Sequence, residues 1–270
     1  MKFALLNGSR IEAIKGVNAQ CTICGSNVIA KCGKIRIDHW AHKGERNCDP
    51  WWEPETEWHR RWKNAFSAEW QEYALFDERT GEKHIADVRT ADGLVLEFQH
   101  SAIAPKERTS REQFYKSMAW IVDGSRLKRD HPRFLKGQSN WRKTGKVGFY
   151  LVSFPEDCFP ALWLDSAVPV VFDFLGTDLL ANPGDLRNSV YCLFPGRVGR
   201  EAVVVVMTRE QFITIANNGD WIKWVDNFMN GPSHSEREQQ TQPSQPSLNA
   251  RRRESQYILE RGRWVKRRRL

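Results

Sequence analysis

The chain has 270 residues, and its 40% of hydrophobic residues and twelve tryptophans suffice for one moderate domain with appendages or two small ones. Its formal net charge of +8 favours an acidic partner such as nucleic acid. No apolar run approaches the length of a membrane span, and the first residues show no secretory pattern. We therefore expect a cytoplasmic protein without a membrane partner.

Residues 1–50 are predicted to form short strands and turns around a metal site. Cys21 and Cys24 have the spacing of half a zinc site. Four residues are candidates for the other half: Cys32, His39, His42 and Cys48. His42 and Cys48 enclose a workable loop, so we take Cys21, Cys24, His42 and Cys48 as the structural Zn²⁺ set. Zn²⁺ would stabilise a segment too short to build its own core, and reduced thiols without metal are the alternative.

A helix is predicted from Pro54 to about Tyr73. Proline suits a first helical turn, and acids crowd this start. Glu55, His59 and Lys63 are spaced to share one face of this helix.

A β-hairpin with converging acids follows. Strands are predicted near 74–78, 83–90 and 94–101, and Asp92-Gly93 is a strong turn signal. Glu97 and Gln99 leave their strand on one face, and the hairpin folds Asp87 back beside them. Two carboxylates from adjacent strands make an Mg²⁺ site of the kind that phosphodiester cleavage needs. Ordinary strand acids facing solvent are the alternative.

The next elements complete an order of helix, three strands, helix and strand. A second helix is predicted over 107–118 and a buried strand over 119–123, with a further strand over 146–154. Residues 124–145 between them read as a basic loop. Trp141 in this loop is either a stacking partner for a base or part of a mobile surface. His100 points away from Glu97, and we expect it to pack behind the sheet.

The last part of the chain shows no motif with recognisable chemistry. Residues 156–230 contain strand-like runs and a helix near 210–228, and they form either an extension of the sheet or a small second domain. Residues 231–270 hold ten Lys/Arg and four acids, so this tail carries +6. Its Gln, Ser and Pro content predicts disorder, and its charge fits either nucleic-acid binding or simple solubility.

Several ordered motifs together resemble the competence protein CoiA-like family of the PD-(D/E)xK nuclease superfamily. In chain order these motifs are the Cys21/Cys24 pair, His39-Trp40-Ala41-His42, the run 57–63 (EWHRRWK), 85–88 (IADV), 97–103 (EFQHSAI) and 111–115 (REQFY). The resemblance implies a nuclease domain over 51–155 with a restriction-endonuclease-like αβββαβ core in an α/β (α+β) protein. It also implies that His59 serves the active site. Gln99 stands where the superfamily usually has a lysine.

We therefore expect a Mg²⁺- or Mn²⁺-dependent deoxyribonuclease that acts in DNA uptake, recombination or processing. Asp87 and Glu97 would bind the catalytic metal, Gln99 would orient water, and His59 would assist. DNA is the expected partner, with recombination proteins as further candidates. Two alternatives remain open: a non-catalytic DNA-binding module with a degenerate site, and a zinc-stabilised scaffold.

Overall fold

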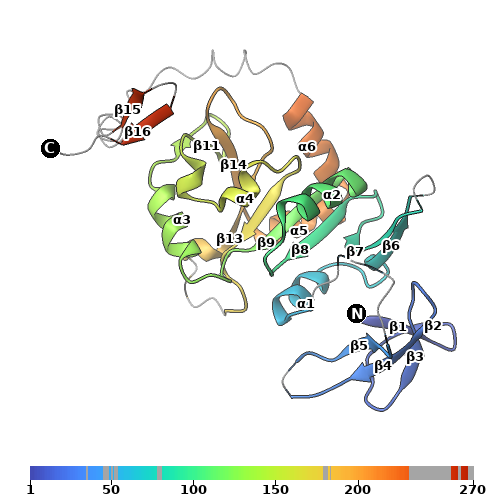
Figure 1. Cartoon of the computed structure of the whole chain (residues 1–270). Coiled ribbons are helices and arrows are strands. Elements are labelled where there is room, and N and C mark those ends of the chain that lie inside the picture. The colour runs from blue at the N-terminus through green and yellow to red at the C-terminus, as the bar shows by residue number, and fades with distance from the viewer. Residues whose placement is uncertain are drawn as a thin grey trace.

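The computed structural model describes residues 1–34, 36–44, 49, 51, 54–77, 81–178, 182, 184–230, 257–260 and 263–266 (Figure 1). For 228–230, 257–260 and 263–266 it describes the backbone alone. The chain forms a small N-terminal sheet and a larger α+β unit built on a mixed sheet. In the described part of the chain, no helix combines the length and apolar character needed to span a bilayer.

The N-terminal unit is an antiparallel sheet of five strands in the order β2-β1-β3-β4-β5. Its strands are β1 (Phe3–Leu6), β2 (Ser9–Glu12), β3 (Asn18–Gln20), β4 (Asn27–Lys31) and β5 (His39–His42). Its small core contains Ala4, Val28 and Trp40. Backbone amides of Lys2 and Phe3 donate to the Glu72 carboxylate at 2.6 and 3.0 Å, which fastens this sheet to the larger unit.

The larger unit is a nine-stranded sheet in the order β10-β11-β14-β13-β12-β9-β8-β7-β6. Its strands are β6 (Gln71–Phe76), β7 (Lys83–Arg89), β8 (Val95–Gln99), β9 (Met118–Asp123), β10 (Arg142–Lys143), β11 (Phe149–Val152), β12 (Val170–Asp173), β13 (Ser189–Leu193) and β14 (Ala202–Thr208). Strands β8, β9 and β12 are parallel neighbours, and the other pairings are antiparallel. These three strands are buried at every position, as is typical of parallel strands covered on both faces.

Helices cover both faces of this sheet. They are α1 (Glu57–Lys63), α2 (Pro105–Tyr115), α3 (Asp130–Gln138), α4 (Ala161–Leu164), α5 (Arg209–Asn217) and α6 (Asp220–Asn230), with short 3₁₀ turns at Pro155–Asp157 and Leu186–Asn188. One core layer gathers side chains of α1, α5 and α6, including Trp62, Phe212 and Trp221. The other gathers side chains of α2, α3 and α4, including Phe134 and Trp163.

The predicted α+β class and the order of helix, three strands, helix and strand are present as α1, β6, β7, β8, α2 and β9. The predicted hairpin is confirmed: Gly93 adopts φ +91°, and the amide of Thr90 donates to the carbonyl of Leu94 at 2.9 Å. The first helix is much shorter than predicted. Thr56 caps its start by accepting from the amide of His59, and the chain leaves the helix at Asn64 to pair β6 with β7.

Two further predictions were wrong. Residues 124–145 contain α3 and β10 in place of a single loop. Trp141 packs against Phe134, Tyr150 and Phe159, and its indole lies 3.2 Å from the sulfur of Cys158, so it is no free stacking platform. The helix predicted over 210–228 is two helices, because Gly219 between them adopts φ +74°.

Strands β12, β13 and β14 from residues 156–230 belong to the same sheet as β8 and β9. In the tail predicted to be disordered, the structure instead describes a two-stranded hairpin of β15 (Tyr257–Glu260) and β16 (Arg263–Lys266). The rest of the tail lies outside the described residues.

Candidate functional site

Three acids form a row across β6, β7 and β8. The register of β6 on β7 pairs Gln71 with Val88 and Tyr73 with Ala86, which sets Glu72 opposite Asp87. The register of β7 on β8 pairs Val88 with Leu96, which sets Asp87 opposite Glu97. Like charges directly opposite one another destabilise a sheet, so this row requires compensating charge.

The predicted convergence of Asp87 and Glu97 is present, and the two side chains replace part of the β ladder. The amide of Asp87 donates to Glu97 Oε1 at 3.2 Å, and the amide of Phe98 donates to Asp87 Oδ2 at 3.0 Å. Each carboxylate therefore accepts a backbone hydrogen bond from the opposite strand. This exchange fixes both acids at one point where β7 and β8 meet.

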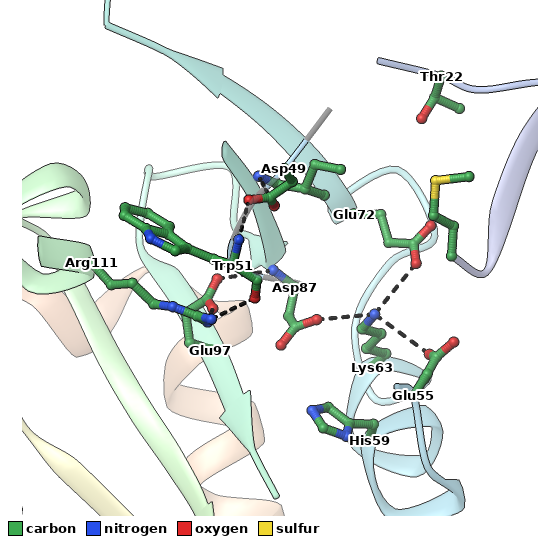
Figure 2. Close-up of a pocket in the computed structure, with 12 residues that line it drawn as sticks. Thr22, Asp49, Trp51, Glu55, His59, Lys63, Glu72, Asp87, Glu97 and Arg111 are labelled. Carbon is green, nitrogen blue, oxygen red and sulfur yellow. Dashed lines mark hydrogen bonds and ion pairs between the residues drawn. The ribbon is translucent and has the colours of Figure 1, made fainter. Parts of the chain in front are cut away.

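Lys63 on α1 supplies a positive charge to this row. Its Nζ lies 3.0 Å from Asp87 Oδ1, 3.4 Å from Glu55 Oε1 and 3.5 Å from Glu72 Oε1. Figure 2 shows the ammonium group between Asp87 on one side and Glu55 and Glu72 on the other. Burial would lower the pKa of Lys63, but the three carboxylates outweigh it and raise the pKa above its ordinary value. Lys63 is thus held as a buried cation.

Arg111 on α2 compensates Glu97 from the other side of the row. Its Nη1 lies 2.8 Å from Glu97 Oε2, and its Nη2 donates to the carbonyl of Trp51 at 2.5 Å. Burial and then the charge of Asp87 nevertheless raise the pKa of Glu97 to about 8. An additional positive charge next to Glu97 would therefore favour the ionised form of its carboxyl group.

These residues line one pocket, which we call the carboxylate pocket (Figure 2). Its ionisable lining comprises Asp49, Glu55, Glu72, Asp87, Glu97, His59, Lys63 and Arg111. Asp49 also accepts from the amide of Ile85 at 3.0 Å and faces His84 at 3.2 Å, and Trp51 stacks on that imidazole. Hydrogen bonding to His84 lowers the pKa of Asp49 although burial opposes it.

Helix α1 is anchored to β12, the middle strand of the nine-stranded sheet. The indoles of Trp58 and Trp62 both donate to Asp173 Oδ2, at 3.0 and 2.9 Å, and Arg209 also binds this carboxylate. Trp62 lies on Phe98 with ring centres 5.9 Å apart. The position of Lys63 on the next face of α1 therefore depends on Asp173 in β12.

The sequence-predicted residues divide between two places. Asp87, Glu97 and His59 line the carboxylate pocket. Glu55 and Lys63 also line it, but Glu55 precedes α1, so only His59 and Lys63 share a face of the helix as their spacing predicted. Gln99 lines a different pocket beyond the end of β8, where its amide donates to the carbonyl and Oγ of Ser101 at 3.2 and 3.3 Å.

His100 also lines that second pocket. It lies on the α1 side of the sheet, with its ring centre 6.3 Å from that of Trp58. Beyond the packing role that we expected, its Nδ1 is hydrogen-bonded to Asp123 Oδ2 at 2.8 Å. No local pattern indicated this pair, because Asp123 is the last residue of the neighbouring strand β9.

The proposed zinc ligands of the N-terminal unit are brought together as far as they are described. Cys21, Cys24 and His42 offer ligand atoms that all lie within 4.8 Å of one another. Cys24 Sγ is 3.3 Å from His42 Nε2. Burial would raise the pKa of Cys24, but hydrogen bonds, first from Ser26, lower it to about 6. A low thiol pKa favours the thiolate that binds metal, so this cluster could hold a metal such as zinc.

The remaining candidates for the zinc site lie elsewhere or are not described. Cys32 Sγ is directed to the carbonyl of Ala13 at 3.9 Å, and His39 Nδ1 lies 2.9 Å from the carbonyl of Ile37. Cys48 lies outside the described residues. A structural zinc site needs a fourth ligand, and Cys48 stays a prediction for it.

Sequence reasoning missed Glu72, Asp49 and the charge-bearing role of Lys63. The helical spacing of Lys63 from His59 did place it on the correct face. Its contact with Asp87 joins a helix to a strand, and no local pattern encodes such a contact. Glu72 offered no signal, because its φ of +48° and its place opposite Asp87 depend on the strand register.

Comparison with known proteins agrees with the motif resemblance. Residues 6–50 match the family model described as the N-terminal domain of competence protein CoiA. The chain is also 27% identical over 148 residues to the competence protein CoiA of Bacillus subtilis (strain 168), a match that covers 49% of this chain but only 38% of that protein. No solved structure matches the chain. The similarity to competence protein CoiA that the ordered motifs indicated is therefore confirmed.

Proposed function

We propose that the chain is a divalent-metal-dependent DNA nuclease. The observation that carries this proposal is the pairing of Asp87 and Glu97 across β7 and β8, with Lys63 Nζ 3.0 Å from Asp87. Two acidic side chains on adjacent strands, with one cation beside them, are the groups that metal-assisted phosphodiester hydrolysis requires.

The residues present fit a divalent cation. Asp87 and Glu97, with the backbone carbonyl of Phe98 or Gln99, would hold Mg²⁺ or Mn²⁺, both of which prefer oxygen ligands. The raised pKa of Glu97 is consistent with this, because its causes are burial and the like charge of Asp87. A bound divalent cation lowers the pKa of water and offsets charge on the scissile phosphate.

The cation that the superfamily places at position 99 comes here from α1. Lys63 would stabilise negative charge developing on the phosphate, and its three carboxylate neighbours keep it protonated. His59, on the same side of the pocket, would donate a hydrogen bond to the phosphate. Gln99 donates to Ser101 in this structure, so it orients a water only after its side chain turns.

The biological setting is proposed from similarity. The Bacillus subtilis relative is named a competence protein, and the chain spans 38% of its length. We propose a role in competence, namely in the uptake, recombination or processing of DNA in the cytoplasm, with recombination proteins as partners. We also propose that Zn²⁺ bound by Cys21, Cys24, His42 and Cys48 stabilises the N-terminal sheet.

The test is cleavage of linear and circular DNA by the full chain with added Mg²⁺, added Mn²⁺ or no added divalent metal. We expect metal-dependent cleavage that Glu97→Ala and Asp87→Ala abolish. Glu69→Ala, which removes an exposed acid of the same unit, is the matched control and should cleave as the unaltered chain does. Intact DNA with both metals would refute the proposal.

A second candidate function is a DNA-binding module without catalysis. The observation that favours it is the direction of Gln99, which lies outside the carboxylate pocket lining and is hydrogen-bonded to Ser101. The cleavage test separates the two functions, because this module would bind DNA in a salt-sensitive way and leave it intact with every metal.

A further inference from the structure

A second pocket opens beyond the carboxyl ends of the three parallel strands. Residues at the ends of β8, β9 and β12 line it, namely Gln99, Asp123 and Phe172, together with the loop before α3 and residues of α4. The region outside the carboxyl ends of parallel strands is where ligands bind in open α/β sheets. We call it the arginine pocket, because Arg126, Arg129 and Arg133 line it.

The charges of the arginine pocket are only partly compensated. Its two acids are engaged already: Asp130 faces Arg133 at 3.2 Å, and Asp123 pairs with His100 at 2.8 Å. Among the described residues, no acid forms an ion pair with Arg126 or Arg129, and both side chains are exposed. Two arginines without an acidic partner at the mouth of a pocket favour an anion with several acceptor oxygens, such as a phosphate.

The rest of the lining is apolar. Leu127 and Leu162 are partly exposed there, and Trp163 and Phe174 also line the pocket. An apolar wall next to uncompensated arginines matches a nucleotide, which presents a flat base next to a phosphate. In a duplex the base faces are stacked, so only an unpaired nucleotide places its base against such a wall.

The arginine pocket adjoins the carboxylate pocket. Glu97 lines one and Gln99 the other, and two residues along a strand span about 7 Å. The two histidines also connect them, since the ring centres of His59 and His100 lie 6.4 Å apart. A DNA strand whose phosphate is bound at the carboxylate pocket can therefore place a neighbouring nucleotide in the arginine pocket.

We propose that the arginine pocket binds one unpaired nucleotide of single-stranded DNA next to the phosphate at the carboxylate pocket. Arg126 and Arg129 contact its phosphate, and Leu127 and Leu162 contact its base. This inference rests on the proposed function for the identity of the ligand as DNA. It adds that the chain prefers single strands to duplexes.

The test is fluorescence anisotropy with a short single-stranded oligonucleotide and its duplex, using the full chain without added divalent metal. We expect tighter binding of the single strand. In Arg126→Ala/Arg129→Ala this binding should weaken by about tenfold or more. Because both arginines contact one phosphate, the slope of log affinity against log salt should become less steep by about 0.7. Lys128→Ala is the matched control: it removes an exposed cation of the same loop that does not line the pocket, and it should leave the affinity almost unchanged.

A second variant separates the base from the phosphate. Leu162→Ala should reduce the preference for single strands and leave the salt slope unchanged, with folding checked by thermal unfolding. Equal binding of strand and duplex, or an equal loss in Lys128→Ala and the arginine variant, would overturn the inference. So would full affinity for thymidine monophosphate alone, because the pocket would then be a mononucleotide site.

The outcomes also distinguish this inference from the nuclease proposal. Arginine-dependent binding of single strands, with no cleavage in the presence of any metal, would refute the nuclease proposal and support nucleotide binding in the arginine pocket. Metal-dependent cleavage, with unaltered DNA binding by the arginine variant, would refute nucleotide binding in the arginine pocket and would leave the nuclease proposal intact.

Discussion

Replacing Lys63 by methionine tests whether one buried cation holds the acidic row together. The change keeps the aliphatic stem and removes the charge that faces Asp87, Glu55 and Glu72. Burial would raise the pKa of Glu55, but Lys63, followed by Arg60, lowers it from 4.5 to about 2. A change of that size corresponds to about 3 kcal/mol of favourable interaction, which Lys63 and Arg60 share. Breaking a buried pair by removing one partner costs a similar amount, about 3–5 kcal/mol.

We therefore expect Lys63→Met to lose about 3 kcal/mol of unfolding free energy at neutral pH, which lowers the melting temperature by about 6–12 °C. Thermal and urea unfolding measure this loss. Arg61→Met is the matched control on the same helix, because Arg61 is exposed and donates to the carbonyl of Thr177. It should cost less than about 0.5 kcal/mol.

The pH dependence of this loss follows from the direction of the Glu55 shift. A carboxyl with a lowered pKa stabilises the folded state above its unfolded value of 4.5, and this contribution is lost as the pH falls toward about 2. The difference between the two proteins should therefore be largest near neutral pH and should shrink in acid. A loss no larger than that of Arg61→Met, or one that does not change with acid, would refute this account of the row.

Three further predictions concern other groups. Burial and Asp87 raise the pKa of Glu97 from 4.5 to about 8, so its stabilising contribution is complete below the lower value and is lost as the pH rises through the higher one. Without added divalent metal, the melting temperature of the unaltered chain should fall from about pH 5 to about pH 9 more steeply than that of Glu97→Gln, and parallel profiles would contradict this. Asp173→Ala leaves two indole donors and Arg209 without their shared acceptor and should cost about 3 kcal/mol or more in urea unfolding, whereas a cost below about 1 kcal/mol would show that α1 is held by packing alone. Cys24→Ala should release zinc, measured as metal per chain by mass spectrometry, while Cys32→Ala retains it, and equal zinc in both variants would exclude the Cys21, Cys24 and His42 cluster as the site.

The features that the sequence predicted well are local ones. Asp92-Gly93 defined the hairpin because a turn with positive φ at glycine depends on neighbouring residues alone. The convergence of Asp87 and Glu97 followed from that turn and from the alternation of a strand. The predicted end of the first helix was wrong. The apolar stripe of the sequence continues through Phe66 and Trp70, whereas β6 begins at Gln71 and pairs with β7. Tertiary pairing overrode the helical pattern there.

The features that the sequence did not predict join distant segments. The indole of Trp58 and the carboxylate of Asp173 are 115 residues apart in the chain. His100 and Asp123 meet only because β8 and β9 are parallel neighbours, and Trp141 lost its predicted surface role because it faces Phe134 and Phe159. Residues 156–230 showed no chemistry in the sequence for the same reason: their contribution to the site is the anchor of α1.

The contact of Lys63 with Asp87 changes the interpretation of the glutamine at position 99. A lysine at that position would project from β8 on the same side as Glu97 and would bring one positive charge to the paired acids. Here a lysine of α1 brings that charge to Asp87, and the indoles of Trp58 and Trp62 bind Asp173 in β12 and so fix the helix that carries it. In the proposed nuclease the positive charge would therefore come from α1, so the absence of a lysine from β8 is a weak argument against that proposal. It also follows that Asp173 in the middle strand of the sheet helps to fix where this charge lies.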